Sequence, residues 1–249
     1  MTTSIDDRDL FLQERQKEIC HLGQDTTLHQ LTSEWFNQAT RHRYSYHFDW
    51  LGLPIIQYPQ DIIAIQEIIW KTKPNIIIET GIARGGSLIF NASMLHLLNN
   101  KGRVIGIDID IRAHNREAIE KHPLSERIHL IQGSSIESDT LLQIKHLIQP
   151  TDKVMVILDS NHTYEHVLTE LMLYSPLVTQ SCYLIVLDTV IKMMDDSHFV
   201  DRPWDNRHNN PHTAVDTFLQ KNNRFIIDYE TQNKLLITVA PNGYLKCIL

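Results

Sequence analysis

Between residues 76 and 187, short apolar runs alternate with longer amphipathic stretches. A short apolar run is typical of a buried strand, and apolar positions three and four residues apart are typical of a helix. The expected strands lie at 76–79, 103–108, 128–132, 153–158 and 183–187, and the expected helices at 87–98, 112–121, 137–148 and 163–174. Alternation of this kind implies parallel strands with right-handed crossovers. The pattern therefore predicts a Rossmann-like α/β fold, with a mostly parallel central sheet and helices on both faces.

The N-terminal part of the chain has a different pattern. Residues 4–50 are polar with apolar positions at helical spacing, which predicts two or three helices. Asp61 is placed to cap a further helix over 61–71. We therefore expect a helical N-terminal extension over 1–60 and one α/β domain over 61–249.

The C-terminal part is expected to close the sheet. Residues 192–212 are polar and form a long loop, of the kind that often serves as a lid or binding loop. A helix is expected over 213–220. Residues 225–229 and 235–239 look like two strands, which predicts an antiparallel C-terminal edge.

Composition and charge narrow the range of partners. The chain has 249 residues, 42% hydrophobic and 21% charged, which is ordinary for one globular domain. Its net charge of −7 and scattered basic residues argue against a nucleic-acid partner. Neither a membrane span of roughly 20 apolar residues nor a signal peptide is recognisable in the sequence, whose acidic start is MTTSIDDRDL. We therefore expect a cytoplasmic protein without a membrane span.

A glycine-rich loop follows the first expected strand, in the run from Glu79 to Ser87 (ETGIARGGS). Gly81 and its neighbouring glycines let the backbone approach a ligand closely, and the following helix offers free N–H groups. The spacing is not the G-x-G-x-x-G of dinucleotide sites. The leading Glu79 suits a cationic ligand end, such as the ammonium group of a methionine moiety. The alternative is a turn that only packs the helix on the strand.

Polar residues follow the next two expected strands. Asp108 ends the second one and can accept both hydroxyls of a ribose, although Asp110 competes for that role. After the third strand, Gly133, Ser134 and Ser135 leave room for a flat adenine, with hydroxyls that can bond to its edge. A plain turn is an equally acceptable interpretation of these three residues.

The fourth and fifth expected strands are followed by acids. Asp159 and Asp188 should emerge at the same edge of the sheet and could hold a hard cation such as Mg²⁺. Such a cation lowers the pKa of a bound hydroxyl, and the nearby His162 could take the proton. The alternative is that Asp159 caps the next helix and that His162 is unused.

These motifs together resemble the family that groups cephalosporin-hydroxylase-named proteins with rhamnosyl and macrolide-sugar O-methyltransferases. The runs that carry the resemblance are PIIQYPQD, IIETGIARGGS, VIGIDIDIRAHN, LDSNHTYEHVLTEL and LLITVAPNGYLK, so it covers roughly residues 40 to 249. The resemblance implies a class I methyltransferase fold that binds S-adenosylmethionine and often uses Mg²⁺. Many members are oligomers that modify antibiotics, glycolipids or other sugar-bearing products, so antibiotic biosynthesis and a homo-oligomer are expected.

The resemblance also implies roles for individual residues. The residues that match the cofactor loop are Glu79, Gly81 and Ser87; Asp108 matches the ribose ligand, Asp159 and Asp188 match the metal ligands, and His162 matches the general base. The family usually has Glu-Asp at the second metal position, whereas this chain has Leu187-Asp188. Three interpretations are open: weaker metal binding, a substitute acid from the loop, or no metal. The candidate substitutes are Asp195, Asp196, Asp201 and Asp205.

The expected reaction is methyl transfer from S-adenosylmethionine to a hydroxyl of a sugar moiety or a secondary metabolite. His162 would be the base, and a cation at Asp159 and Asp188 would stabilise the alkoxide. Residues 192–212 and the N-terminal helices would close over the acceptor.

A non-catalytic S-adenosylmethionine-binding protein, or a partner subunit of a tailoring enzyme, is the alternative that Leu187 supports. A nicotinamide-dependent oxidoreductase fits the loop spacing less well, and a non-haem iron oxygenase would need a second histidine.

Overall fold

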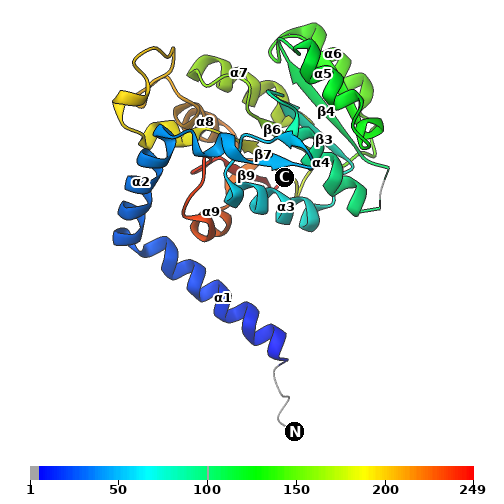
Figure 1. Ribbon diagram of the computed structural model, residues 1–249. Coiled ribbons are helices and arrows are strands. Elements are labelled where there is room, and N and C mark those ends of the chain that lie inside the picture. Colours follow the sequence, from blue (N-terminus) through cyan, green and yellow to red (C-terminus); the bar gives the residue numbers. More distant parts are fainter. Residues whose placement is uncertain (1–5, 100) are drawn as a thin grey trace.

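The computed structural model describes residues 6–99 and 101–249. In this part of the chain, seven strands form the main sheet in the order β5-β4-β3-β6-β7-β9-β8 (Figure 1). Neighbours from β5 to β7 are parallel, whereas β9 is antiparallel to both β7 and β8. The strands are β3 (Ile76–Thr80), β4 (Arg103–Asp108), β5 (Ile128–Gln132), β6 (Val154–Leu158), β7 (Tyr183–Val186), β8 (Phe225–Ile227) and β9 (Tyr244–Cys247). The predicted α/β fold with a mostly parallel sheet is confirmed.

Helices cover both faces of this sheet. Every residue of β3 and β6 is buried, and successive side chains of a strand point to opposite faces, so neither face is open to solvent. Helix α3 (Pro59–Thr72) precedes β3. The helices that follow β3 are α4 (Gly86–Leu97), α5 (Ala113–Glu120), α6 (Ser138–Leu147), α7 (Tyr164–Tyr174), α8 (Pro211–Lys221) and α9 (Tyr229–Leu235). Short 3-10 turns join them, at η2 (Ser125–Arg127), η3 (Ser175–Leu177), η4 (Thr189–Met193) and η5 (Asp196–His198).

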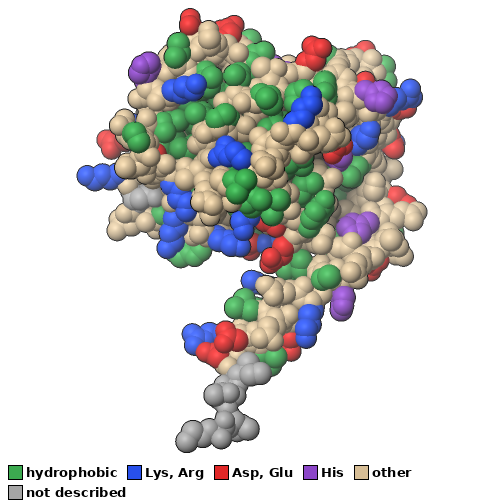
Figure 2. Space-filling view, turned by 180° about the vertical axis from the view of Figure 1, so that it is seen from behind, with side chains coloured by type: hydrophobic (Ala, Val, Ile, Leu, Met, Phe, Trp, Pro, Cys, Tyr) green, Lys and Arg blue, Asp and Glu red, His purple; other side chains and the backbone are tan. Residues whose placement is uncertain are grey.

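Two helices precede the α/β core, as the N-terminal pattern predicts. They are α1 (Asp7–Gln24), which begins after the capping residue Asp6, and α2 (Thr26–Arg41), which Asp25 caps. A turn, η1 (Tyr44–His47), and a small hairpin of β1 (Asp49–Trp50) and β2 (Leu53–Pro54) follow. Figures 1 and 2 show α1 projecting from the body, and its main contacts are with α9. Residues 1–5, on which part of the signal-peptide interpretation rests, lie outside the described residues.

The predicted role of Asp61 is wrong. Helix α3 begins earlier, at Pro59, and the N-cap residue before it, Tyr58, makes no side-chain cap. The Asp61 carboxylate is instead fully buried and accepts hydrogen bonds from the Thr238 hydroxyl, from the Val239 amide at 3.0 Å and from the Tyr244 hydroxyl at 2.6 Å. Burial is the main cause that raises the pKa of Asp61, to about 6. This carboxylate ties α3 to the C-terminal part of the chain.

The predicted strand over 235–239 is also wrong. The sheet does close with an antiparallel pair, but its partner strands are β8 and β9, and α9 occupies residues 229–235. Asp228 caps α9 by accepting a hydrogen bond from the Thr231 amide, which starts a helix directly after β8. The amide of Val239 donates to Asp61 and not to a strand. The later run YLKC then supplies the edge strand.

The register of the sheet brings the polar strand ends together. Thr80 of β3 pairs with Leu158 of β6, and Leu158 pairs with Val186 of β7. Residues that directly follow these strands therefore lie at one edge, where open α/β sheets bind their ligands. Among the described residues, no helix is both long and apolar enough to cross a membrane.

Candidate functional site

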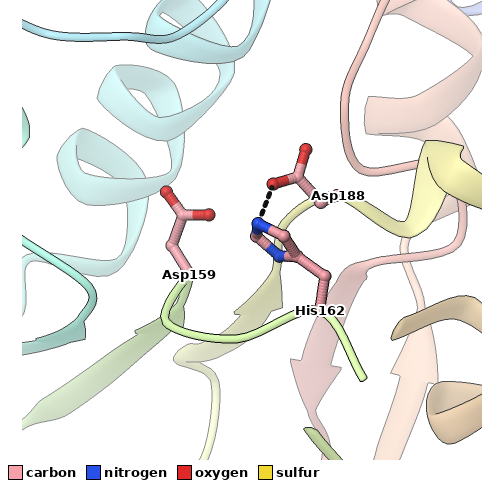
Figure 3. A group of neighbouring side chains, drawn as sticks. All are labelled: Asp159, His162 and Asp188. Carbon is pink, nitrogen blue, oxygen red and sulfur yellow. Dashed lines mark ion pairs between the residues drawn. The ribbon is translucent and has the colours of Figure 1, made fainter. Parts of the chain in front are cut away.

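Two carboxylates and one imidazole meet at the ends of β6 and β7. Asp159 and His162 lie on the loop between β6 and α7, and Asp188 follows β7 (Figure 3). One ligand atom from each residue lies within 4.8 Å of the other two. The Nε2 atom of His162 is 3.3 Å from Oδ2 of Asp188. In the described part of the chain, this is the one group of at least three such side chains with metal-ligand geometry.

The electrostatics of this group favour a cation. Burial raises the pKa of Asp159 well above its usual range, and the carboxylates of Asp188, Glu79 and Glu170 raise it further. A bound cation offsets the repulsion among such carboxylates. Mg²⁺ commonly binds through one or two carboxylates and keeps several waters. The donor set of Asp159 and Asp188 therefore fits Mg²⁺, with His162 beside it.

The position before Asp188 adds no oxygen to the group. Leu187 stands where the resemblance predicts a glutamate. Its side chain is buried and packs in the hydrophobic core. Asp188 itself has φ of 55°, a left-handed conformation that is costly for a residue with a Cβ and that often marks a functional position.

The four acids of the 195–205 loop are not part of the metal-ligand group found among the described residues. Asp205 accepts hydrogen bonds from the amides of Arg207, His208 and Asn209, and these bonds, that of His208 first, lower its pKa. Asp196 forms an ion pair with Arg207 at 3.4 Å. The loop thus uses these two acids to hold its own shape.

The same loop covers His162. The rings of His162 and Trp204 meet edge to face, with centroids 4.7 Å apart and planes at 85°. The side chain of Asn209 accepts a hydrogen bond from the Tyr164 amide at the start of α7. The loop is therefore held against the segment that carries His162.

A small cavity of about 100 Å³ lies beside this group, at the ends of β3 to β6. Five of the predicted cofactor residues line it: Gly81, Asp108, Gly133, Ser134 and Ser135. Asp108 accepts hydrogen bonds from the amides of Ile82, at 2.8 Å, and Asp110, at 3.0 Å. Asp108 lines the cavity, and the side chain of Asp110 is exposed and lies 3.9 Å from Arg112. The structure thus places Asp108, rather than Asp110, at the cavity.

The other two predicted cofactor residues lie behind the loop. Glu79 is buried, and its carboxylate accepts hydrogen bonds from the Ser87 hydroxyl and, at 2.7 Å, from the Asn91 amide group on α4. Burial is the main cause that raises the pKa of Glu79, to about 7. Neither Glu79 nor Ser87 is among the described residues that line the cavity. In this structure the pair fastens β3 to α4.

Sequence reasoning missed several residues of the cavity. Ser160, Asn161 and His166 also line it, and Glu170 lies buried behind them. A signal was present, because His166 and Glu170 are four residues apart on a predicted helix and therefore share a face. What the sequence did not show is that this face turns toward the loop at Ser135.

The order of the strands in the sheet is that of a class I methyltransferase fold, and the polar residues described above lie at the carboxyl ends of β3 to β7. Solved structures agree at the level of the fold. The structure described as cmcI-D160 Mg-SAM matches with a TM-score of 0.59 and 19% identity, over 82% of this chain and 78% of that one. The O-methyltransferase from Bacillus cereus in complex with SAH matches with a TM-score of 0.53 and 18% identity, over 78% of this chain and 81% of that one.

The chain belongs to the rhamnosyl O-methyltransferase/CmcI family, whose sequence profile matches residues 42–248. Rhamnosyl O-methyltransferase of Mycobacterium tuberculosis (strain H37Rv) is 28% identical over 199 residues, which are 79% of this chain and 76% of that protein. The Mycobacterium leprae protein of the same name is 28% identical over 202 residues, 79% and 81% of the two chains. The predicted family and the predicted class of enzyme, an S-adenosylmethionine-dependent O-methyltransferase, are confirmed.

Proposed function

We propose that this protein transfers a methyl group from S-adenosylmethionine to a hydroxyl of a sugar moiety or a sugar-bearing secondary metabolite, with His162 as general base. The observation that carries the proposal is the juxtaposition of His162, Asp159 and Asp188 beside a cavity lined by Asp108 and Ser135. The names of the family and of its mycobacterial relatives, which are rhamnosyl O-methyltransferases, support a sugar hydroxyl as the acceptor.

The cavity residues would position the methyl donor. Asp108 offers carboxylate oxygens to the ribose hydroxyls, and Gly133, Ser134 and Ser135 leave room for the adenine. Gly81 lets the cofactor loop pass close to the Asp159 carbonyl, because its φ is 87° and a Cβ at this position would overlap that carbonyl. We assign Glu79 and Ser87 to the cofactor loop, whose shape their buried hydrogen bond maintains.

The acceptor oxygen then attacks the methyl carbon as the carbon–sulfur bond breaks, and the products are a methyl ether and S-adenosylhomocysteine. His162 takes the proton of the acceptor hydroxyl, and the nearby Asp188 carboxylate stabilises the imidazolium that forms. Because the electrophile is supplied by the sulfonium, the main task of the protein is alignment. A Mg²⁺ ion held by Asp159 and Asp188 would lower the pKa of the acceptor hydroxyl and stabilise its alkoxide.

A larger cavity is formed partly by residues that follow Asp188 along the chain. A cavity of about 320 Å³ lies between α2, η4 and the segment after α9. Phe36 and Asn37 of α2 form one wall, and Val190 and Met193, which follow Asp188 closely along the chain, form another. A volume of this size and a mostly apolar lining with a few polar groups are typical of a small-molecule site. We propose that it receives the part of the acceptor beyond the methylated sugar.

A second candidate function is a non-catalytic S-adenosylmethionine-binding protein or partner subunit. The specific observation in its favour is Leu187, which brings an apolar side chain to a position where the family usually has an acid. This candidate predicts cofactor binding without turnover.

Methyl transfer can be tested directly. The purified protein is incubated with S-adenosylmethionine, Mg²⁺ and a panel of rhamnosides and other glycosides, and the products are analysed by mass spectrometry. We expect one glycoside class to gain a single methyl group, with release of S-adenosylhomocysteine. The matched control is Asp159→Asn, which should give no product. A parent protein that binds S-adenosylhomocysteine but methylates no member of the panel would favour the non-catalytic candidate.

A cytoplasmic location, a homo-oligomer and a domain boundary near residue 60 stay predictions.

A further inference from the structure

One face of α7 carries three polar side chains that contact the loops after β5 and β6. His166, Glu170 and Tyr174 follow one another at intervals of four residues, so they lie on the same side of the helix. The Tyr174 hydroxyl donates a hydrogen bond of 2.8 Å to the backbone carbonyl of Ser135. The Nε2 atom of His166 lies 3.0 Å from the Ser135 hydroxyl oxygen. Both the backbone and the side chain of Ser135 are therefore held by α7.

The hydrogen-bond chain continues from His166 to a buried acid. The His166 Nε2 atom also lies 3.1 Å from the hydroxyl oxygen of Ser160, and the Ser160 hydroxyl donates a hydrogen bond of 2.7 Å to Oε1 of Glu170. Glu170 is completely buried. Three of these hydrogen-bonded residues, Ser135, Ser160 and His166, line the cavity that we assign to the adenosyl group.

This arrangement fixes the direction of each hydrogen bond. A carboxylate only accepts, so Ser160 must use its one hydroxyl hydrogen on Glu170. Ser160 can then only accept from His166, which places a hydrogen on Nε2 and makes that nitrogen a donor. The single hydrogen on Nε2 is shared between the Ser160 and Ser135 oxygens as a bifurcated bond, so the Ser135 hydroxyl accepts from His166 and keeps its own hydrogen for another partner. The described residues thus present Ser135 as a hydrogen-bond donor at the cavity wall.

We propose that His166 and Glu170 are positioning residues that make Ser135 a donor toward a ring nitrogen of adenine, and that they thereby select an adenine over a hypoxanthine base. This inference rests on the proposed function, because it assumes that the cavity holds the adenosyl group. The N1 atom of adenine accepts a hydrogen bond. The N1 atom of hypoxanthine carries a hydrogen, so a donor at Ser135 would meet another donor.

The cost of the arrangement supports a functional role. The Oε2 atom of Glu170 is buried and has no hydrogen-bond partner among the described residues. A buried polar atom without a partner destabilises the folded state. Glu170 also adds to the negative charge around Asp159. The other oxygen, Oε1, accepts from Ser160 and lies 3.6 Å from Nε2 of His166, so the carboxylate acts on the two side chains that hold Ser135 while Oε2 stays unpaired.

The test compares two ligands by calorimetric titration: S-adenosylhomocysteine and its deaminated analogue S-inosylhomocysteine. The parent protein is compared with His166→Leu, which removes the donor, His166→Gln, which keeps an amide donor, and Glu170→Gln, which keeps the size of the side chain but can donate as well as accept. The matched control is His212→Leu, because His212 forms the same kind of pair four residues from Asp216, at 3.2 Å, and is not among the described residues that line the cavity. Circular dichroism confirms that each variant is folded.

We expect the parent and the His212→Leu variant to prefer the adenosyl ligand by at least about fivefold, the factor for one neutral hydrogen bond. His166→Leu and Glu170→Gln should lose most of this preference, and His166→Gln should keep part of it. An equal loss of affinity for both ligands in His166→Leu and Glu170→Gln would overturn the inference, and so would a parent that binds both ligands equally. If the parent binds neither ligand, the proposed function fails and the inference fails with it.

Discussion

The imidazole of His162 and the carboxylate of Asp188 lie 3.3 Å apart although they come from the ends of different strands. The pairing depends on the register of β6 and β7, which places Leu158 opposite Val186 and so aligns the loops that follow. Figure 3 shows Asp159 on the other side of the same small space. A histidine, the carboxylate beside it and a second acid are therefore positioned by the parallel sheet itself.

Replacing the proposed base tests its role in turnover. In His162→Ala, we expect turnover to fall by roughly 10²-fold or more, the usual share of a general base, with unchanged affinity for S-adenosylhomocysteine. Steady-state kinetics and calorimetry measure the two quantities. The control is His146→Ala, an exposed histidine on α6 whose loss should change neither. Turnover equal to that of the parent would remove His162 from the mechanism.

Removing one acid should separate stability from metal binding. Burial and the neighbouring carboxylates both raise the pKa of Asp159. Asp159→Asn removes the repulsion between Asp159 and these carboxylates, and it removes the cost of burying a charged group. We expect the free energy of unfolding without metal to rise by about 0.5–2 kcal/mol, as is common for stabilising substitutions. Mg²⁺ should raise the Tm of the parent but not that of the variant. A variant that is less stable than the parent, or one that Mg²⁺ still stabilises equally, would contradict the electrostatic account.

Gly81 offers a steric test of the loop. An added Cβ would overlap the backbone of Asp159, and the φ of 87° is itself unfavourable for other residues. Gly52 has a similar φ of 94° with nothing near its missing Cβ, so it is a matched control. We expect Gly52→Ala to cost about 1 kcal/mol of stability, and Gly81→Ala to cost more and to weaken binding of S-adenosylhomocysteine. Chemical denaturation and calorimetry measure these effects. Equal costs in the two variants would show that the contact with Asp159 is unimportant.

The buried Glu79 predicts a pH dependence of stability. Its pKa is about 7 in the folded protein against an ordinary 4.5, so the folded chain keeps a proton that the unfolded chain has released. Between pH 4.5 and 7 the folded state binds more protons, and its stability falls as the pH rises, by up to about 3 kcal/mol. In Glu79→Gln this contribution disappears, so the stability of the variant relative to the parent should increase from pH 4.5 to pH 7.

The side chain of Asn91 can adjust to a glutamine at position 79. The Oδ1 atom of Asn91 is buried without a partner among the described residues, so a turn of the Asn91 amide can accept from the new glutamine. Denaturant unfolding at several pH values, without ligand, gives the comparison. A difference between variant and parent that stays constant with pH would mean that Glu79 is already ionised at pH 5.

The sequence predicted the five parallel strands and the placement of acids at their ends, because short apolar runs and alternating helices determine this part of the fold locally. The proximity of Asp159, His162 and Asp188 could be predicted for the same reason, since parallel strands end at one edge of the sheet. Their distances needed the register, which the pattern does not contain.

The errors arose where long-range contacts override local pattern. The apolar run at 235–239 looks like a strand, yet the Val239 amide donates to Asp61, which lies far away in the sequence. Asp61 itself has the local features of a helix cap but is buried by the C-terminal segment. The His166 and Glu170 pair was visible as helical spacing, but its contact with Ser135 depends on how α7 packs beside the loop after β5. Such partners become visible only in three dimensions.

The central claim is that the ends of β3 to β6 hold S-adenosylmethionine beside a metal-assisted base. The most direct measurement is calorimetric titration of the purified protein with S-adenosylhomocysteine, with and without Mg²⁺. We expect saturable binding of one ligand per chain in both conditions, abolished or strongly weakened in Asp108→Ala, whose side chain lines the cavity. Absence of binding in both conditions would contradict the claim and would leave the glycine-rich loop as a structural turn or a site for another nucleotide.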